Sequence, residues 1–163
     1  MHEVPTALQA VLNQYNVLSL AVCYDDIPWA ANAFYVYDDS EQRLILMSSL
    51  DTRHGEMLSV NRQVAGTITP QFDDIRQIHG VQFLGVARQL DTPGLAAPAL
   101  QRYYQRFPLA AGMTAAVWDI HLVRLKLTDN RLGFGTKVQW NRHAGRVIPG
   151  ASALHTPLTT SSL

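Results

Sequence analysis

The sequence has a single cysteine, no long apolar run and no basic segment near its start, and each absence excludes a class of protein. Cys23 cannot form an internal disulfide bond, and because it lies in the apolar stretch VLSLAVCY we expect a core residue rather than a nucleophile. No stretch reaches the roughly 18 apolar residues that a membrane-spanning helix needs. The first residues also lack the basic region and the cleavage site of a secretory signal. We therefore expect a cytoplasmic protein.

Charge is scarce as well. Only 16% of the 163 residues are charged, whereas about a quarter is typical of soluble proteins. The 13 basic and 13 acidic residues cancel, which removes the electrostatic attraction that drives binding to nucleic acid and to membrane surfaces. We therefore expect neither partner. A surface with so little charge indicates that a protein partner covers part of it.

The hydrophobic pattern predicts a mainly β protein. Stretches rich in β-branched and aromatic residues, separated by turn clusters such as DDI and DDSEQ, indicate strands at residues 17–24, 28–37, 43–49, 63–70, 78–90, 117–130 and 131–140. Helical spacing of apolar residues predicts helices within the first fifteen residues, at 52–61 and at 95–107, where Pro98 would lie in the first turn.

These elements predict one domain with a specific architecture. About six strands with peripheral helices favour a six-stranded antiparallel barrel of Greek-key type, over residues 1–142. Residues 143–163 are rich in small and hydroxylic residues and are expected to form a mobile tail. In the strand at 117–130 the alternation changes parity, which indicates a β-bulge near Leu122. By the same alternation Asp119 and His121 should face outward, and His121 is expected to be solvated.

The segment RLILMSSLDTRHGEML joins an apolar strand to a helix and concentrates hydrogen-bond donors. A helix N-terminus offers free amides and an arginine offers a bidentate clamp, which together suit a phosphate group. Thr52, Arg53, Ser48 and Ser49 fit that use. The alternative is structural: Thr52 caps the helix, and Arg53 pairs with Asp51 on the surface, a contact worth under about 1 kcal/mol.

Two further segments could contact a planar ring. Small and polar residues in the middle of an aromatic-rich strand, Ala30, Ala31 and Asn32, would leave a flat opening. The alternative is that the alanines pack under the N-terminal helix. Gln82 interrupts an apolar strand and could donate a hydrogen bond to a ring edge, although a strand glutamine on its own usually faces solvent.

The order of these segments resembles the split-barrel flavoproteins similar to pyridoxamine 5'-phosphate oxidase. The motifs PWAANAFYVYD, DTRHGEM, VAGTI, IHGVQFLG, RFPLA and TDNRLGFGTKVQW are similar to the uncharacterised bacterial YhbP-like family within that superfamily, over residues 10 to 142. The resemblance implies a homodimer that holds flavin mononucleotide (FMN) between its subunits.

The resemblance also implies roles for particular residues. Thr52, Arg53 and His54 would hold the FMN phosphate with Ser48 and Ser49 nearby, residues 30–34 would back the flavin ring, Gln82 would touch its edge, and Lys137 and Trp140 would reach the partner's flavin. His54 replaces the usual lysine, so the charge at that position depends on its surroundings. The arginine and histidine pattern that grips pyridoxal phosphate is missing near the C-terminus, so vitamin B6 oxidation is not predicted.

Three functions remain open at this point. The first is an FMN-dependent oxidoreductase of unknown substrate, without an identified acid or base. The second is a non-catalytic flavin-binding or carrier protein. The third is a split barrel that binds another planar or anionic ligand, such as haem or a nucleotide. Hydrolase and metal functions are disfavoured, because the sequence has no Gly-x-Ser-x-Gly motif and its six histidines have no short ligand spacing.

Overall fold

The structure is a computed structural model, and it describes residues 3–133 and 135–143. Its strands are β1 (Val17–Tyr24), β2 (Ile27–Asp38), β3 (Arg43–Ser48), β4 (Gln63–Ile68), β5 (His79–Gln89), β6 (Ala116–Asp129) and β7 (Thr136–Asn141). The α-helices are α1 (Thr6–Gln14), α2 (Arg53–Val60) and α3 (Pro93–Arg106), and the short 3-10 helices are η1 (Ile75–Gln77), η2 (Pro108–Gly112) and η3 (Asn130–Leu132). None of the described helices is long and apolar enough to cross a membrane.

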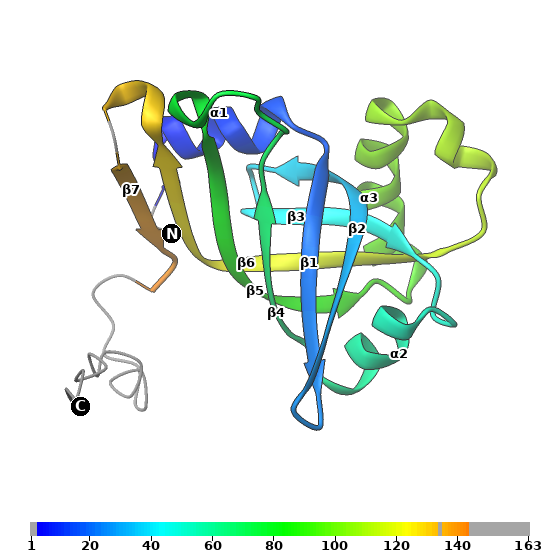
Figure 1. Cartoon of the computed structure of the whole chain (residues 1–163). Coiled ribbons are helices and arrows are strands. Elements are labelled where there is room, and N and C mark those ends of the chain that lie inside the picture. Colours follow the sequence, from blue (N-terminus) through cyan, green and yellow to red (C-terminus); the bar gives the residue numbers. More distant parts are fainter. Residues whose placement is uncertain (1–2, 134, 144–163) are drawn as a thin grey trace, which may run out of the picture.

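The seven strands form one antiparallel sheet in the order β3-β2-β1-β4-β5-β6-β7. An additional pairing of β3 with β6 closes six of them into a ring, and β7 extends the sheet beyond β6 (Figure 1). The order β3-β2-β1-β4, in which β4 returns to lie beside β1, is a Greek key. The predicted six-stranded Greek-key barrel is therefore confirmed for the ring, with β7 as an added strand.

Local sequence explains two features of the barrel. Asp25 and Asp26 form the two-residue turn between β1 and β2, and both have positive φ, 51° and 59°, as a type I′ hairpin requires. Leu84 pairs with Arg124 whereas Gly85 pairs with Leu122, so one residue of β6 is inserted at this point. The β-bulge predicted near Leu122 is confirmed, and it turns the second half of β6 so that its apolar residues again face inward.

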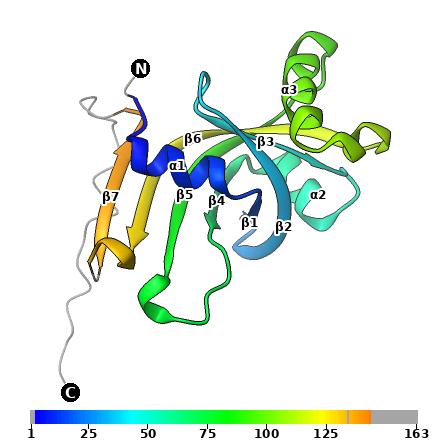
Figure 2. The same cartoon turned by 90° about the horizontal axis from the view of Figure 1, so that it is seen from above.

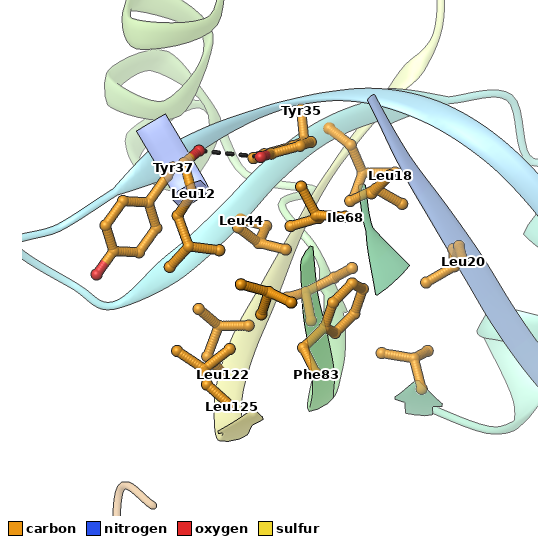
Figure 3. Close-up of a cluster of buried hydrophobic side chains, with 14 of the residues drawn as sticks. Leu12, Leu18, Leu20, Tyr35, Tyr37, Leu44, Ile68, Phe83, Leu122 and Leu125 are labelled. Carbon is orange, nitrogen blue, oxygen red and sulfur yellow. Dashed lines mark hydrogen bonds between the residues drawn. The ribbon is translucent and has the colours of Figure 1, made fainter. Parts of the chain in front are cut away.

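The main core fills the inside of the barrel (Figure 3). Alternate residues of the strands point into it, and α1 covers one end of the barrel, as Figures 1 and 2 show. Leu8, Val11 and Leu12 of α1 are buried there, and the hydroxyl of Tyr35 donates a hydrogen bond of 2.9 Å to the Leu12 carbonyl. Burial of this apolar face, rather than the short helix's own propensity, holds α1 in place.

A second apolar cluster lies on the outer side of the barrel, under α3. Ile45 of β3 and Val117 of β6 are buried against Ala99 and Tyr103 of α3. Both faces of β3 and of the start of β6 are therefore covered. This explains why the strand pattern there is nearly continuous in apolar residues rather than alternating.

Asp119 is completely buried, although the strand alternation places it on the outer face of β6. Arg43 donates to Asp119 at 2.9 Å and Arg88 donates to it at 2.7 Å, while Arg43 also binds Asp38 at 3.0 Å. The prediction that His121 is solvated is wrong, because His121 is half-buried beside this network. Two buried carboxylates thus share an arginine at the edge of the second cluster.

Two smaller predictions are corrected, and a third is not tested. Cys23 is exposed on the outer face of β1, because Val22, not Cys23, points into the core. Helix α3 begins at Pro93, so Pro98 lies inside the helix rather than in its first turn. The predicted tail lies outside the described residues from residue 144 onward.

Candidate functional site

The turn between β3 and α2 has the capped geometry that its sequence predicts. The hydroxyl of Thr52 accepts a hydrogen bond of 3.1 Å from the Gly55 amide and donates one of 2.9 Å to the Ser49 carbonyl. Gly55 is buried, and a Cβ atom there would lie 2.3 Å from the Ser49 carbonyl oxygen. Only glycine fits at this position, so the helix starts close against the end of β3.

Ser48 and His54 form a hydrogen-bonded pair across this turn. The Ser48 hydroxyl lies 2.6 Å from Nε2 of His54, and the Thr52 hydroxyl lies 3.3 Å from the same nitrogen. Burial lowers the pKa of His54 below its ordinary value, so the ring is neutral near pH 7. His54 therefore supplies hydrogen-bonding capacity at the turn and not the permanent positive charge of a lysine.

Arg53 points to the other side of α2. Its guanidinium lies 4.7 Å from the centre of the Trp29 ring, a cation–π contact. It lines a hollow of about 470 Å³ together with Asp51 and Glu56. Asp51 accepts a hydrogen bond from the Ser49 hydroxyl, and among the described residues no ion pair of Arg53 is found. The predicted surface pair between Arg53 and Asp51 is therefore replaced by stacking on Trp29.

A cavity of about 610 Å³ opens beside this turn, and we call it the Ser48–His54 cavity. Its polar end is lined by Asn32 of β2 and by Ser48, Ser49 and His54. Its apolar end is lined by α3, the segment that follows it and the neighbouring strands, through Phe34, Met47, Tyr103, Phe107, Leu109 and Met113. The volume lies within the range of small-molecule sites. Four of the residues predicted from the sequence are thus brought together in one cavity.

The apolar wall of this cavity could not be assigned from the sequence. Phe34, Tyr103 and Phe107 form an aromatic cluster in which Phe107 lies 5.3 Å and 5.0 Å from the other two ring centres. Leu109 is 95% exposed, and Met113 is 64% exposed. The signal in the sequence is the apolar run FPLAAGM after the helix, in a position where a loop is normally polar.

Gln82 lies outside this cavity, on the outer face of the barrel. It lines a separate hollow of about 420 Å³ with Thr67 and Lys126. The strand register nevertheless connects it to the main cavity, because Asn32, Ser19, Thr67, Gln82 and Lys126 pair successively across five strands. We call this line of side chains the polar row. Ser19 donates a hydrogen bond of 2.8 Å to Asn32 within it.

The alanines of β2 lie next to the polar row. Ala30 is exposed and pairs with Ala21, which pairs in turn with Ala65 of β4. The alternative in which the alanines pack under the N-terminal helix is therefore wrong for Ala30. Ala31, the next residue, is half-buried. The small alanine side chains of these adjacent strands protrude little from the outer face. This agrees with the opening that the sequence predicts in the middle of β2.

The last two predicted residues belong to β7. Lys137 is exposed, whereas Trp140 is buried in the barrel core, 3% exposed, with the Arg142 guanidinium 5.7 Å from its ring centre. In both views β7 lies at the opposite end of the molecule from α3 (Figures 1 and 2). Contact of these two residues with a flavin stays a prediction, and within one chain they lie far from the Ser48–His54 cavity.

The lowered pKa of His54 predicts how stability depends on pH. As the pH falls below about 6.5, the unfolded chain takes up a proton that the folded chain resists, so the free energy of unfolding should decrease. A His54→Gln variant keeps a hydrogen-bonding group beside Ser48 but does not titrate. Its unfolding free energy, measured in urea, should therefore fall less between about pH 7.5 and about pH 5 than that of the wild type. Equal pH slopes in the two proteins would contradict this assignment.

Solved structures with this architecture define the fold class. A heme binding protein from Mycobacterium smegmatis superposes with a TM-score of 0.69 at 21% identity, over 86% of this chain and 60% of that one. A FAD-binding protein from Mesorhizobium loti gives 0.64 at 16% identity, over 76% and 94%. A protein named "Putative Pyridoxamine 5'-phosphate oxidase" from Listeria innocua gives 0.58 at 17% identity, over 73% and 93%. The chain has the split-barrel fold of these proteins.

Sequence comparison then gives the family. No protein-family model matches the chain. A UPF0306 protein of Klebsiella pneumoniae (strain 342) is 43% identical over 143 residues, which cover 88% of this chain and 97% of that protein. A UPF0306 protein of Photorhabdus laumondii is 43% identical over 131 residues, or 80% and 91%. The chain belongs to the UPF0306 family. The similarity to the YhbP-like family that the sequence motifs indicate stays a prediction.

Proposed function

We propose that this protein binds FMN as a homodimer and acts as a flavin-dependent oxidoreductase. The observation that carries the proposal is the Ser48–His54 cavity, which joins Asn32 of β2 to the polar turn before α2. These are the two segments that the split-barrel resemblance assigns to the flavin ring and the phosphate. A FAD-binding protein and a protein named as an oxidase of pyridoxamine 5'-phosphate share the fold, which supports a flavin.

The residues at the start of α2 fit a phosphate group. The amides of Arg53 and His54 precede the first capped amide, that of Gly55, and a helix N-terminus attracts anions. The contact of Arg53 with Trp29 is exposed and worth about 0.5–1 kcal/mol, whereas a hydrogen bond between ionised groups is worth about 1.5–3 kcal/mol. Arg53 would therefore leave Trp29 and bind the phosphate.

FMN would supply hydride and electron transfer, while the protein orients the ring and limits access of water. Ser48 and His54 face the cavity as a neutral hydrogen-bonded pair and can hold or accept a proton at its polar end. Asn32, fixed by Ser19, presents an amide to the same space. These groups bind and orient a ligand without placing a fixed charge beside it.

The outer face around the polar row is the surface that we assign to the second subunit. Ala21, Ala30 and Ala65 give this face small side chains, two of which line the hollow of about 420 Å³ at Gln82, and the face exposes Leu84 at 43%. Asn32 belongs both to this face and to the Ser48–His54 cavity. A symmetric partner on this face would bring its own Gln82 toward the cavity and would cover apolar surface. This arrangement accounts for the low charge of the sequence.

Flavin retention after desalting tests the proposal. We expect wild-type protein mixed with excess FMN to keep the visible flavin bands, with a mass by light scattering near twice 18.1 kDa. Arg53→Ala should weaken FMN binding about thirtyfold, which corresponds to the loss of about 2 kcal/mol from one charge-assisted contact. Arg62→Ala removes another exposed arginine, located after the end of α2, and serves as the matched control.

Two outcomes would contradict the proposal. Colourless wild-type protein would exclude FMN, and equal weakening by Arg53→Ala and Arg62→Ala would exclude the phosphate site at α2. A retained flavin that reduced nicotinamide does not bleach would support a non-catalytic flavin-binding or carrier protein instead of an oxidoreductase.

Haem is the second candidate ligand. It is favoured by the heme binding protein with the same fold and by the apolar end of the cavity, which suits a porphyrin edge. Among the described residues His54 is the histidine that lines the cavity, and it is paired with Ser48. Titration with hemin distinguishes the candidates, since saturable binding at one haem per chain that His54→Gln abolishes would favour haem over FMN.

A further inference from the structure

We infer that the apolar end of the Ser48–His54 cavity binds a small, uncharged, planar aromatic molecule. The claim that this molecule is the substrate rests on the proposed flavin function. The claim that the cavity binds such a molecule depends on the cavity alone. The polar end adjoins the start of α2, whereas the apolar end lies beside α3, and Figure 1 places these helices on opposite sides of the end of β3.

The described lining of the cavity is uncharged, which favours an uncharged ligand. No lysine, arginine, aspartate or glutamate lines it among the described residues. Its two titratable groups are neutral near pH 7, because burial lowers the pKa of His54 and raises that of Tyr103. The nearest cation at the turn, Arg53, lines a different hollow. A phosphorylated or carboxylated substrate would therefore lose its hydration without gaining a countercharge.

The aromatic cluster is the second argument. Phe107 meets Phe34 edge-to-face, with an angle of 64° between the rings, and the Tyr103 hydroxyl donates to the Phe34 carbonyl at 3.4 Å. Tyr103 and Phe107 belong to one helical turn of α3 and its end, so the cluster is held by the second apolar core. Aromatic rings attract other rings in offset or edge-to-face arrangements. The cluster thus favours a planar ring over a flexible aliphatic chain.

The unusual exposure of this wall is the third argument. Phe34 is 54% exposed although it faces the cavity, and Leu109 and Met113 lie beyond it with most of their surface open. A cavity of about 610 Å³ has room for a bicyclic ring system. Such a ligand would remove the aromatic and aliphatic side chains of the wall from water, which gives the binding its driving force.

Two fluorescent probes that differ by one charged group test the inference on flavin-free protein. N-phenyl-1-naphthylamine is neutral, and 8-anilinonaphthalene-1-sulfonate has a closely related ring system with a sulfonate. We expect saturable binding of the neutral probe at one per chain, about tenfold tighter than binding of the sulfonate. Phe34→Ala should weaken the neutral probe about tenfold, because a half-exposed ring contact is lost.

Controls make the result specific to the cavity. Ile75→Ala removes another large exposed side chain, 66% exposed on η1 and outside the cavity, and should leave the affinity within about twofold. Leu109→Asp places a charge on the wall at a position that is 95% exposed, so it tests the site without disturbing the core. It should weaken the neutral probe.

The outcomes separate this inference from the proposed function. Tighter or equal binding of the sulfonate, or a neutral probe that ignores both Phe34→Ala and Leu109→Asp, would overturn the inference. Neutral-probe binding with the expected responses, in a protein that retains no FMN, would uphold the binding site and refute the flavin function. Arg53→Ala should lose FMN and keep the neutral probe.

Discussion

Replacement of Asp119 by asparagine should lower the free energy of unfolding by about 3 kcal/mol, because it removes the charge that compensates two arginines at a buried position. Asp119 is fully buried, and it accepts hydrogen bonds from Arg43 at 2.9 Å and from Arg88 at 2.7 Å. Arg43 has a side chain that is only 12% exposed, so water cannot replace the lost carboxylate. Asparagine preserves the shape of the side chain and one acceptor oxygen, which isolates the effect of charge.

The control for this prediction is another aspartate–arginine pair of the same chain. Asp74 binds Arg76 at 2.8 Å, but the arginine is 83% exposed, and solvent-exposed pairs of this kind contribute little to stability. Urea unfolding of the wild type, Asp119→Asn and Asp74→Asn gives the comparison. Similar losses in both variants would show that burial does not decide the strength of the Asp119 network.

Replacement of Gly55 by alanine should destabilise the protein by about 1–3 kcal/mol and abolish FMN binding. In an exposed helix the same change would stabilise the protein by about 1 kcal/mol, because alanine has the higher helix propensity. At Gly55 the new Cβ atom would lie 2.3 Å from the Ser49 carbonyl oxygen and 3.1 Å from the Leu50 Cα atom. Both contacts are with backbone, so the turn must open, and Thr52 and Ser49 move with it.

Gly94 gives the matched control, since it lies in the first turn of α3 and a Cβ atom there would meet nothing within 4 Å. Gly94→Ala should leave stability equal or slightly higher and should not affect FMN binding. Thermal unfolding and flavin fluorescence of the two variants test both parts. Wild-type FMN affinity in a folded Gly55→Ala protein would show that the turn before α2 is not part of the flavin site.

The positions of the strands along the chain and the capped turn could be predicted because they depend on local signals. The Asp25-Asp26 turn, the parity change at Leu122 and the Thr52 cap each follow from residues close together in the sequence. The start of α2 was recognisable because a capping threonine is followed by a helix with a partial apolar face.

What the sequence could not show depends on contacts between distant segments. Strand alternation places Asp119 on the outer face, but it does not reveal that α3 and Arg88 cover that face. In the same way, the position of Arg53 beside the predicted phosphate site gave no indication that Trp29, on strand β2, would hold its guanidinium. The cavity wall at Phe107 is supplied by a helix that follows the turn by about fifty residues of chain, so no local pattern connects them.

The two ends of the Ser48–His54 cavity suit different chemical groups. The α2 end offers helix amides to an anion, and Arg53 would join them once it leaves Trp29. The α3 end offers neutral aromatic surface. A flavin joined to phosphate by a short chain matches the first end and leaves the second end for a substrate. We propose that the outer face that carries the polar row forms the contact with a second subunit.

The most direct test of the central claim is a crystal structure of the protein grown with FMN. We expect two subunits joined through the outer face that carries Gln82, with the FMN phosphate bound by Arg53 and the first amides of α2 and the ring beside Asn32. An FMN whose phosphate lies away from the start of α2, or a flavin-free Ser48–His54 cavity in crystals grown with saturating FMN, would contradict it.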